Sequence, residues 1–290
     1  NGEGGVMRSP GDDVVAGRAA FGVTNAGLIK RFANNQPVIA LAAILQHSAV
    51  CWLTLDRPDI RSFGDLAGKR LRLLGPGSEE SLSLLAPFDG EHIPRSRLTL
   101  IPADMGIQDL IDGKVDAIDA YTTNEPFLLA QRGIPYQLFM PRSYGIDFYG
   151  DVLFTSREMV DNHPEQVQAF LQASLRGWRY ALDHVDETIA VIQQHYRPDL
   201  SREHLRFEAD TMRDLMQPDL IAIGHMNPAR WYRITELLMG EQAASQLDLE
   251  GFLYRDQTAN RRIHPAIWVQ IYNLFFHLAK IEAIIVQNTI

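Results

Sequence analysis

The feature that most constrains the fold is a junction that occurs twice in the chain. In each copy an apolar stretch ends at a glycine, one basic residue follows, and a run of small and apolar residues comes next, in residues 15–23 (VAGRAAFGV) and 112–120 (DGKVDAIDA). A glycine suits a helix end because the residue after the last turn often has a left-handed backbone. The run after each glycine is apolar enough for a buried parallel strand. The junctions therefore predict two α/β lobes.

A polar loop follows each predicted strand, TNAG at 24–27 and YTTNEP at 121–126. In open α/β sheets ligands bind beyond the carboxyl ends of the strands, so these loops are predicted to line a binding site. Chance similarity of the two copies is the alternative, because helix–glycine–strand junctions occur in every α/β protein.

Length and charge narrow the class of protein. A chain of 290 residues suits one large domain or two lobes of ordinary size. The formal charge of −9 argues against a nucleic-acid partner. The only cysteine, Cys51, excludes an internal disulfide, and its apolar surroundings predict a buried small hydrophobe instead of a nucleophile.

The two ends of the chain raise the question of membrane segments. The polar opening shows no secretory signal, so we expect that one has been removed or left out. The apolar residues 266–290 carry Gln270, Asn273, His277, Lys280 and Glu282, and a membrane span is not expected there because these groups would lie unpaired in hydrocarbon.

The pattern changes along the chain in a way that predicts a discontinuous first lobe. Two apolar strands are expected at 37–45 and 49–55, separated by the polar residues 46–48, whose side chains are expected to face a cleft. Residues 151–156 are predicted to return to the first lobe, and the chain is mostly helical from Arg157. We therefore expect crossings near Asp56 and Val152, with lobe 1 formed by residues 1–55 plus 152–290 and lobe 2 by residues 56–151.

Several ordered motifs between about residues 10 and 255 resemble one known family. The chain is similar to the NMT1/THI5-like (SsuA/THI5-like) branch of periplasmic solute-binding proteins in Gly17–Val23, Gln46–Ser48, Asp65–Lys69, Gly113–Ala117, Asn124–Pro126 and Asn162–Glu165. The resemblance implies a two-lobed α/β fold of the periplasmic-binding-protein type (type II), with a cleft between the lobes and a helical C-terminal part.

The resemblance also implies a function. Family members bind small organic molecules outside the cytoplasm, many of them pyrimidine precursors of thiamine and others sulfonates. We therefore expect extracytoplasmic binding of such a pyrimidine for ABC-type uptake, with a membrane permease as partner. The alternative is the ligand-sensing domain of a signalling protein, whose partner is a following transmembrane module.

One family branch is an enzyme, and this sequence departs from it. That enzyme makes the thiamine pyrimidine from its own histidine and pyridoxal phosphate, with a cysteine-rich run that should align near residues 146–154. This stretch holds no cysteine, and the donor histidine should align near Gly27. We therefore expect no enzymatic activity and no cofactor, and the pyrimidine synthase remains a disfavoured alternative.

A second departure concerns the N-terminus. The family normally begins with a strand and a helix ahead of the first junction, and only about fourteen residues precede it here. Either that strand and helix are missing, or residues 266–290 take their place. The simpler alternative is that residues 266–290 form a peripheral helix.

A site for a flat heteroaromatic ring needs aromatic faces and a few hydrogen-bonding groups. The predicted faces belong to Tyr121, Tyr144, Phe148 and Tyr149, with Trp52 as an outside candidate and ordinary core packing as the alternative. The predicted polar ligand-binding residues are Asn25, Gln46, His47, Ser78, Asn124 and Glu125.

Glu125 is the favoured carboxylate because it can accept hydrogen bonds from an aminopyrimidine-like edge. The alternative is that Asn124 and Glu125 only cap the helix that begins at Pro126. No catalytic residue and no metal site are predicted, since the nine histidines show no HExxH or paired metal spacing and no nucleophile motif appears.

Overall fold

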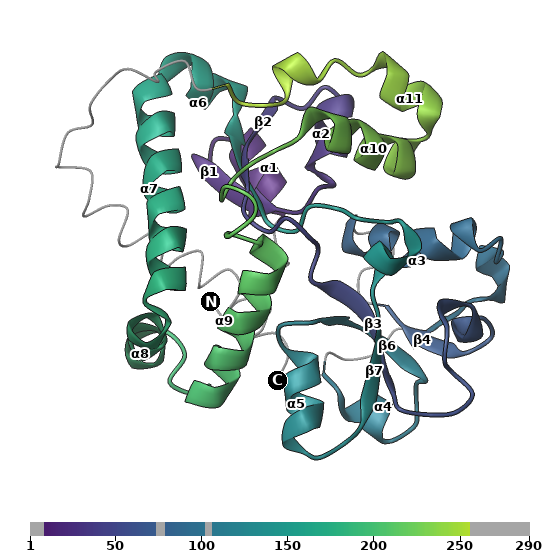
Figure 1. The fold of residues 1–290 in the computed structure, drawn as a ribbon. Helices are drawn as coiled ribbons and strands as arrows, with labels where there is room; N and C mark the ends of the chain where they lie inside the picture. The colour runs from purple at the N-terminus through teal and green to yellow at the C-terminus, as the bar shows by residue number, and fades with distance from the viewer. Residues whose placement is uncertain (1–8, 74–78, 102–105, 256–290) are drawn as a thin grey trace. The chain divides into compact units, whose positions relative to one another are not determined.

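The computed structural model describes residues 9–73, 79–101 and 106–255, which form two compact units drawn in Figure 1. Unit 1 holds the described residues 9–46, 149–179 and 218–255, and unit 2 holds the described residues among 47–148 and 180–217. The chain changes units after Gln46 and Phe148, ahead of the crossings expected near Asp56 and Val152. Residues 180–217, expected in lobe 1, group with unit 2, where Phe127 stacks on His204 at a centroid distance of 4.4 Å.

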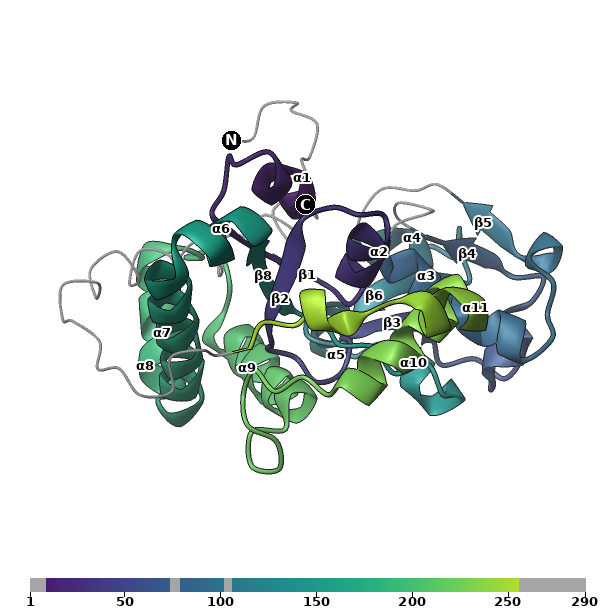
Figure 2. The same cartoon turned by 90° about the horizontal axis from the view of Figure 1, so that it is seen from above.

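Unit 1 is built on a three-stranded antiparallel sheet (Figure 2). Its strands are β1 (Phe21–Thr24), β8 (Val152–Ser156) and β2 (Val38–Ala43), in the order β1-β8-β2. The prediction of a parallel strand in the first junction is wrong: the neighbour of β1 is β8, which runs in the opposite direction. Gly22 permits this pairing, because a Cβ atom there would lie 2.6 Å from the Phe154 ring.

Helices account for most of the rest of unit 1. They are α1 (Pro10–Val15), α2 (Leu28–Ala33), α6 (Arg157–Asn162), α7 (Pro164–Asp183, which continues into unit 2), α10 (Pro228–Met239), α11 (Glu241–Gln246) and η4 (Leu249–Gly251). Phe170 of α7 stacks on Phe21 of β1 with ring centroids 3.8 Å apart, and Trp231 of α10 is fully buried. The stacking of Phe170 on Phe21 joins α7 to the sheet.

Unit 2 is built on a five-stranded mixed sheet. Its strands are β3 (Val50–Leu55), β4 (Arg70–Arg72), β5 (Thr99–Ile101), β6 (Ala117–Tyr121) and β7 (Tyr136–Phe139), in the order β5-β4-β6-β3-β7. Strands β5, β4 and β6 are parallel, and β3 is antiparallel to both β6 and β7.

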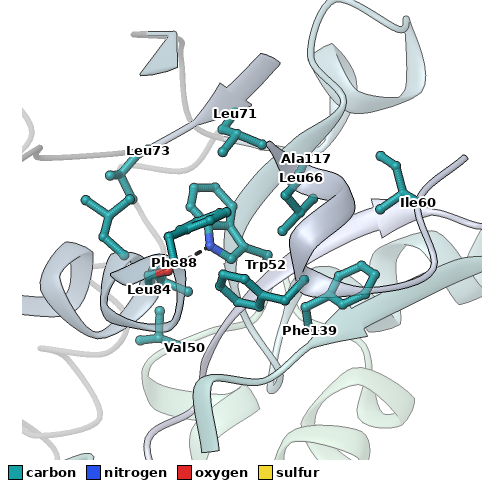
Figure 3. Packing of buried hydrophobic residues seen from close by; sticks show 12 residues of the cluster. Val50, Trp52, Ile60, Leu66, Leu71, Leu73, Leu84, Phe88, Ala117 and Phe139 are labelled. Atoms are coloured by element: carbon teal, nitrogen blue, oxygen red, sulfur yellow. Dashed lines mark hydrogen bonds between the residues drawn. The ribbon is translucent and has the colours of Figure 1, made fainter. Parts of the chain in front are cut away.

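Helices cover both faces of this sheet, as the alternation of side chains along β3 requires. Val50 and Trp52 belong to one hydrophobic cluster, and Cys51 and Leu53 to another. The first cluster includes residues of η1 (Phe63–Leu66) and α3 (Glu79–Gly90), and the second includes residues of α4 (Gln108–Ile111) and α5 (Glu125–Gln131). Figure 3 shows Trp52 inside the first cluster, where its indole Nε1 donates to the Leu84 carbonyl oxygen at 3.0 Å.

The remaining elements of unit 2 are short turns and two helices. They are η2 (Arg95–Arg97), η3 (Pro141–Tyr144), α8 (Val185–His195) and α9 (Arg202–Met216). Within the described residues, no helix has the length and apolar character needed to cross a membrane. Residues 266–290, and with them the question of what replaces the N-terminal strand and helix, lie outside the described residues.

Both predicted junctions are present. Gly17 follows α1 with φ +69° and leads into β1, and Gly113 follows α4 with φ +68° and leads into β6. The polar residues 46–48 separate β2 from β3, as expected. The helical character of the chain after β8 is confirmed for the residues that the structure describes.

Candidate functional site

The sheet topology of unit 2 gathers several predicted residues at one edge. The carboxyl ends of β5, β4 and β6 lie together because these strands are parallel. Strand β7 runs in the same direction as β6, since both are antiparallel to β3. Val50, which begins β3, pairs with Tyr121, which ends β6. The segments before β3 and after β6 and β7 therefore meet at this edge, which we call the unit 2 edge.

The loop after β6 is held in place by Glu125. Its carboxylate accepts hydrogen bonds from the Tyr121 backbone N–H at 2.8 Å and from the Asn124 side-chain amide at 3.1 Å. Glu125 is 5% exposed, and burial raises the pKa of its carboxyl group, while these hydrogen bonds and the charge of Arg72 act in the opposite direction. Asn124 is the N-cap of α5 but makes no side-chain capping bond.

His47 lies at the same edge and pairs with an acid that the sequence did not single out. Its Nδ1 is 2.8 Å from Asp147 Oδ1, and its backbone N–H donates to the Leu215 carbonyl oxygen at 3.2 Å. The segments before β3 and after η3 are thereby joined within unit 2.

Two tyrosines border the hydrophobic cluster of Figure 3. Tyr121 and Tyr144 are both partly buried and pack against that cluster, and the Tyr144 hydroxyl accepts a hydrogen bond from the Phe63 backbone N–H at 3.0 Å. Trp52, an outside candidate, is fully buried in the cluster and serves as core. Ser78 lies outside the described residues.

Unit 1 gathers the other predicted residues at an edge of its own sheet, which we call the unit 1 edge. Thr24 at the end of β1 and Ala43 at the end of β2 both pair with Val152 at the start of β8. Asn25, Gln46 and Tyr149 lie in the segments that extend from these three strand ends.

The side chains at the unit 1 edge are well connected. Gln46 is 2% exposed, and its amide donates to the carbonyl oxygens of Ala43 at 3.2 Å and His225 at 3.0 Å. The Asn25 side-chain oxygen accepts from the Gly27 backbone N–H at 2.8 Å, which orients the start of α2.

The ring of Tyr149 is covered by unit 1 itself. It is 1% exposed, and its hydroxyl accepts from the Asn227 backbone N–H at 2.9 Å. The Arg230 guanidinium lies 4.2 Å from the ring centroid and also donates to the Gln46 carbonyl oxygen, and Trp231 lies 5.1 Å away, measured between centroids.

The structure thus places the predicted residues in two groups. His47, Tyr121, Asn124, Glu125 and Tyr144 belong to the unit 2 edge, and Asn25, Gln46 and Tyr149 belong to the unit 1 edge. Which of them contact a ligand stays a prediction. Two surface hollows of about 390 and 370 Å³ in unit 1 are lined by other residues, among them Phe32 and Arg157 in the first and Met226 and Tyr232 in the second.

Comparison with known proteins gives the family. The sequence model described as NMT1/THI5 like matches residues 6–188, which is more than half of the chain. The chain belongs to the NMT1/THI5-like family. The periplasmic aliphatic sulphonate binding protein SsuA from Escherichia coli shares the fold, with a TM-score of 0.62 and 12% identity over 87% of this chain and 81% of that one.

Three curated relatives of this NMT1/THI5-like chain differ in what their names state. The formylaminopyrimidine-binding protein of Halalkalibacterium halodurans is 25% identical over 159 residues, covering 54% of this chain and 48% of its own. The riboflavin-binding protein RibY of Chloroflexus aurantiacus is 21% identical, covering 70% and 59%. The 4-amino-5-hydroxymethyl-2-methylpyrimidine phosphate synthase of Legionella pneumophila is 23% identical, covering 56% and 52%. The chain therefore spans between 48% and 59% of the length of these relatives.

Three residues at the two edges were not among the ligand-binding side chains predicted from the sequence. Asp147 pairs with His47, Arg230 lies over Tyr149, and Thr122 buries a side-chain hydroxyl. Asp147 had a signal, since it lies in the aromatic segment around Tyr144. Arg230 had none, because 184 residues separate it from its partner Gln46.

Proposed function

We propose that this chain is the ligand-binding part of an extracytoplasmic solute-binding protein, and that its ligand is a pyrimidine precursor of thiamine. The observation that carries the proposal is the match to the formylaminopyrimidine-binding protein over 159 residues, within a chain of the NMT1/THI5-like family. An ABC-type permease is the partner that such a protein would serve. The sensor alternative has no support among the relatives described above.

The chemistry of the unit 2 edge supports this ligand class. Tyr121 and Tyr144 pack against an apolar cluster and are only partly buried, and an aromatic face is what a flat ring stacks on. The two oxygens of Glu125 accept hydrogen bonds from Tyr121 and Asn124, and each carboxylate oxygen has two lone pairs that can accept. A ligand amino group is therefore a suitable donor to Glu125. We propose Asn124 and His47 as further polar contacts at this edge.

The unit 1 edge, taken by itself, carries further proposed contacts. Asn25 has a side-chain amide at the unit 1 edge, and Gln46 has a side-chain oxygen there, since its amide nitrogen already donates to Ala43 and His225. Arg230 adds a cation over the ring of Tyr149. The ring of Tyr149 is covered on the side of Arg230, so we propose that it supports Arg230 and contacts the ligand at most by its rim.

The proposal also holds that this chain binds its ligand without converting it. One relative argues against this part, because the Legionella pneumophila protein is named as a synthase. The single cysteine of this chain is fully buried, its thiol donates to the Ala120 carbonyl oxygen at 3.6 Å, and burial raises the pKa of that thiol well above its ordinary value. A buried neutral thiol is a poor nucleophile and metal ligand. Together with Gly27, where the synthase branch is expected to carry its donor histidine, this favours binding.

A thermal-shift screen tests the proposal, because a ligand that binds only the native state raises the melting temperature. The panel contains 4-amino-5-hydroxymethyl-2-methylpyrimidine, its N-formylaminomethyl analogue, thiamine, riboflavin and an alkanesulfonate. We expect the largest rise with one of the two pyrimidine precursors. A rise confined to riboflavin or to the sulfonate would overturn the ligand class, and conversion of a pyrimidine during the incubation, seen by mass spectrometry, would overturn binding without turnover.

A further inference from the structure

Thr122 carries a buried hydroxyl at the unit 2 edge. The residue is 8% exposed, and among the described residues its Oγ1 has no hydrogen-bond partner. Burying a hydroxyl without a hydrogen bond costs free energy, and most buried side-chain polar atoms in native proteins have a partner. A hydroxyl of this kind is therefore expected to have a partner in the functional state of the protein.

The position of Thr122 is fixed by its backbone. Its N–H donates to the Ala49 carbonyl oxygen at 2.9 Å, which continues the pairing of β6 with β3 by one residue. Tyr121 precedes it, with its backbone N–H held by Glu125 at 2.8 Å. Thr122 thus belongs to a hydrogen-bonded segment directly beyond the carboxyl end of β6, and ligands bind beyond such strand ends in open α/β sheets.

The Thr122 hydroxyl also differs from the Glu125 carboxylate in its unused hydrogen-bonding capacity. The Glu125 oxygens already accept hydrogen bonds from Tyr121 and Asn124. The Thr122 hydroxyl makes no hydrogen bond to any of the described residues. A threonine hydroxyl donates one hydrogen bond and accepts up to two. It can pair with a ring nitrogen as donor or with an amino group as acceptor, and both occur on one edge of an aminopyrimidine.

We propose that the Thr122 hydroxyl hydrogen-bonds the ligand and selects heteroaromatic rings that carry a polar edge. The inference rests on the proposed function and names the residue that sets specificity at the unit 2 edge. A site whose buried polar group needs a partner discriminates strongly against a ligand that lacks one, because the group is then left unpaired in the complex.

The test compares Thr122→Val, Thr122→Ser and the control Thr123→Val by calorimetric titration with 4-amino-5-hydroxymethyl-2-methylpyrimidine. Valine keeps the shape of threonine and removes the hydroxyl, serine keeps the hydroxyl, and Thr123 is a partly buried neighbour in the same loop. We expect Thr122→Val to raise Kd by about 5- to 30-fold, a range that corresponds to one lost hydrogen bond in a buried site. Thr122→Ser and Thr123→Val should stay within about twofold of the wild type, a change within the variation expected for substitutions away from such features.

The melting temperature of the ligand-free variants separates this role from a structural one. Removal of an unpaired buried hydroxyl should leave the melting temperature of Thr122→Val unchanged or raise it. A lower melting temperature with an unchanged Kd would show that the hydroxyl has a partner within the protein, and the inference would fall while the proposed function stands. Failure of the wild type itself to bind the pyrimidine would overturn both.

Discussion

The carboxylate of Glu125 accepts a hydrogen bond from the backbone N–H of Tyr121 at 2.8 Å, so that the first residue of α5 reaches back to the last residue of β6. The bond closes the loop of residues 121–125 onto itself. Glu125 therefore has a structural role whatever the ligand is, and its role in binding must be separated from that structural role by experiment.

Glu125→Ala should weaken binding of the pyrimidine by about 1–3 kcal/mol if the carboxylate pairs with the ligand, because a buried polar group is then left unpaired. It should also lower stability, since the Tyr121 N–H and the Asn124 amide lose their acceptor. Calorimetric titration and denaturant unfolding measure the two effects. Glu165→Ala is the control, an exposed glutamate in the first turn of α7. If Glu125→Ala lowers stability but leaves the affinity for the pyrimidine unchanged, Glu125 closes the loop and does not bind the ligand.

Asp116→Asn should destabilise unit 2 by about 1–3 kcal/mol, because Asp116 is 7% exposed and accepts hydrogen bonds from both Arg57 and Arg70. Burial alone would raise the pKa of Asp116, but hydrogen bonds from the Arg70 side chain and backbone and from Arg57 outweigh it and hold the pKa well below its ordinary value. The stabilisation is therefore present above about pH 4, the ordinary pKa of an aspartate, and is lost as the pH falls below it. Urea unfolding should show that the wild type exceeds the variant in free energy of unfolding by more at pH 7 than at pH 3. An equal difference at the two pH values would contradict this account.

Glu208→Gln should give the opposite pH dependence. Burial raises the pKa of Glu208 to about 7, opposed by the charge of Arg197. The folded state then holds a proton that the unfolded state releases above about pH 4.3, so this group's contribution to stability decreases as the pH rises to about 7. The variant should be more stable than the wild type at pH 8 and show no such gain at pH 4. Differential scanning calorimetry measures the stability difference between the variant and the wild type, and Glu241→Gln, at an exposed residue, is the control. A gain in stability of the same size at pH 4 and pH 8 would contradict the raised pKa.

Trp52→Phe should lower the stability of unit 2 by about 1–3 kcal/mol, because the Leu84 carbonyl oxygen loses its donor and the smaller ring leaves a void in the cluster of Figure 3. Tyr232→Phe, at a residue that is 40% exposed, should have little effect. Denaturant unfolding of both variants checks the comparison. Equal midpoints for the two would mean that Trp52 is not a core residue.

The sequence predicted those parts of the fold that depend on local pattern. Gly17 and Gly113 marked the ends of two helices because the left-handed backbone there favours glycine. The apolar run of residues 49–55 predicted a strand, which the structure confirms as β3, and the structure adds that β3 contributes side chains to two separate hydrophobic clusters. The direction of β1 was wrong because pairing depends on β8, more than 120 residues away, and no local signal identifies that partner.

The sequence identified which loops belong to the candidate site, but it did not identify all of the side chains that belong to it. The loop 121–126 was identified from its position after a strand, and Glu125 from its charge. Thr122 and Thr123 look alike in sequence, and only the pairing of Thr122 with Ala49 shows which of them is the buried one. Arg230 was missed because a helix brings it to the unit 1 edge from a distant part of the chain.

Calorimetric titration of the wild-type chain with 4-amino-5-hydroxymethyl-2-methylpyrimidine and its N-formylaminomethyl analogue tests the central claim most directly. The account predicts saturable binding of at least one of them with one site per chain, at an affinity higher than for riboflavin or an alkanesulfonate. No binding of either pyrimidine, together with saturable binding of riboflavin or of the sulfonate, would contradict the account and assign the chain a different ligand within the NMT1/THI5-like family.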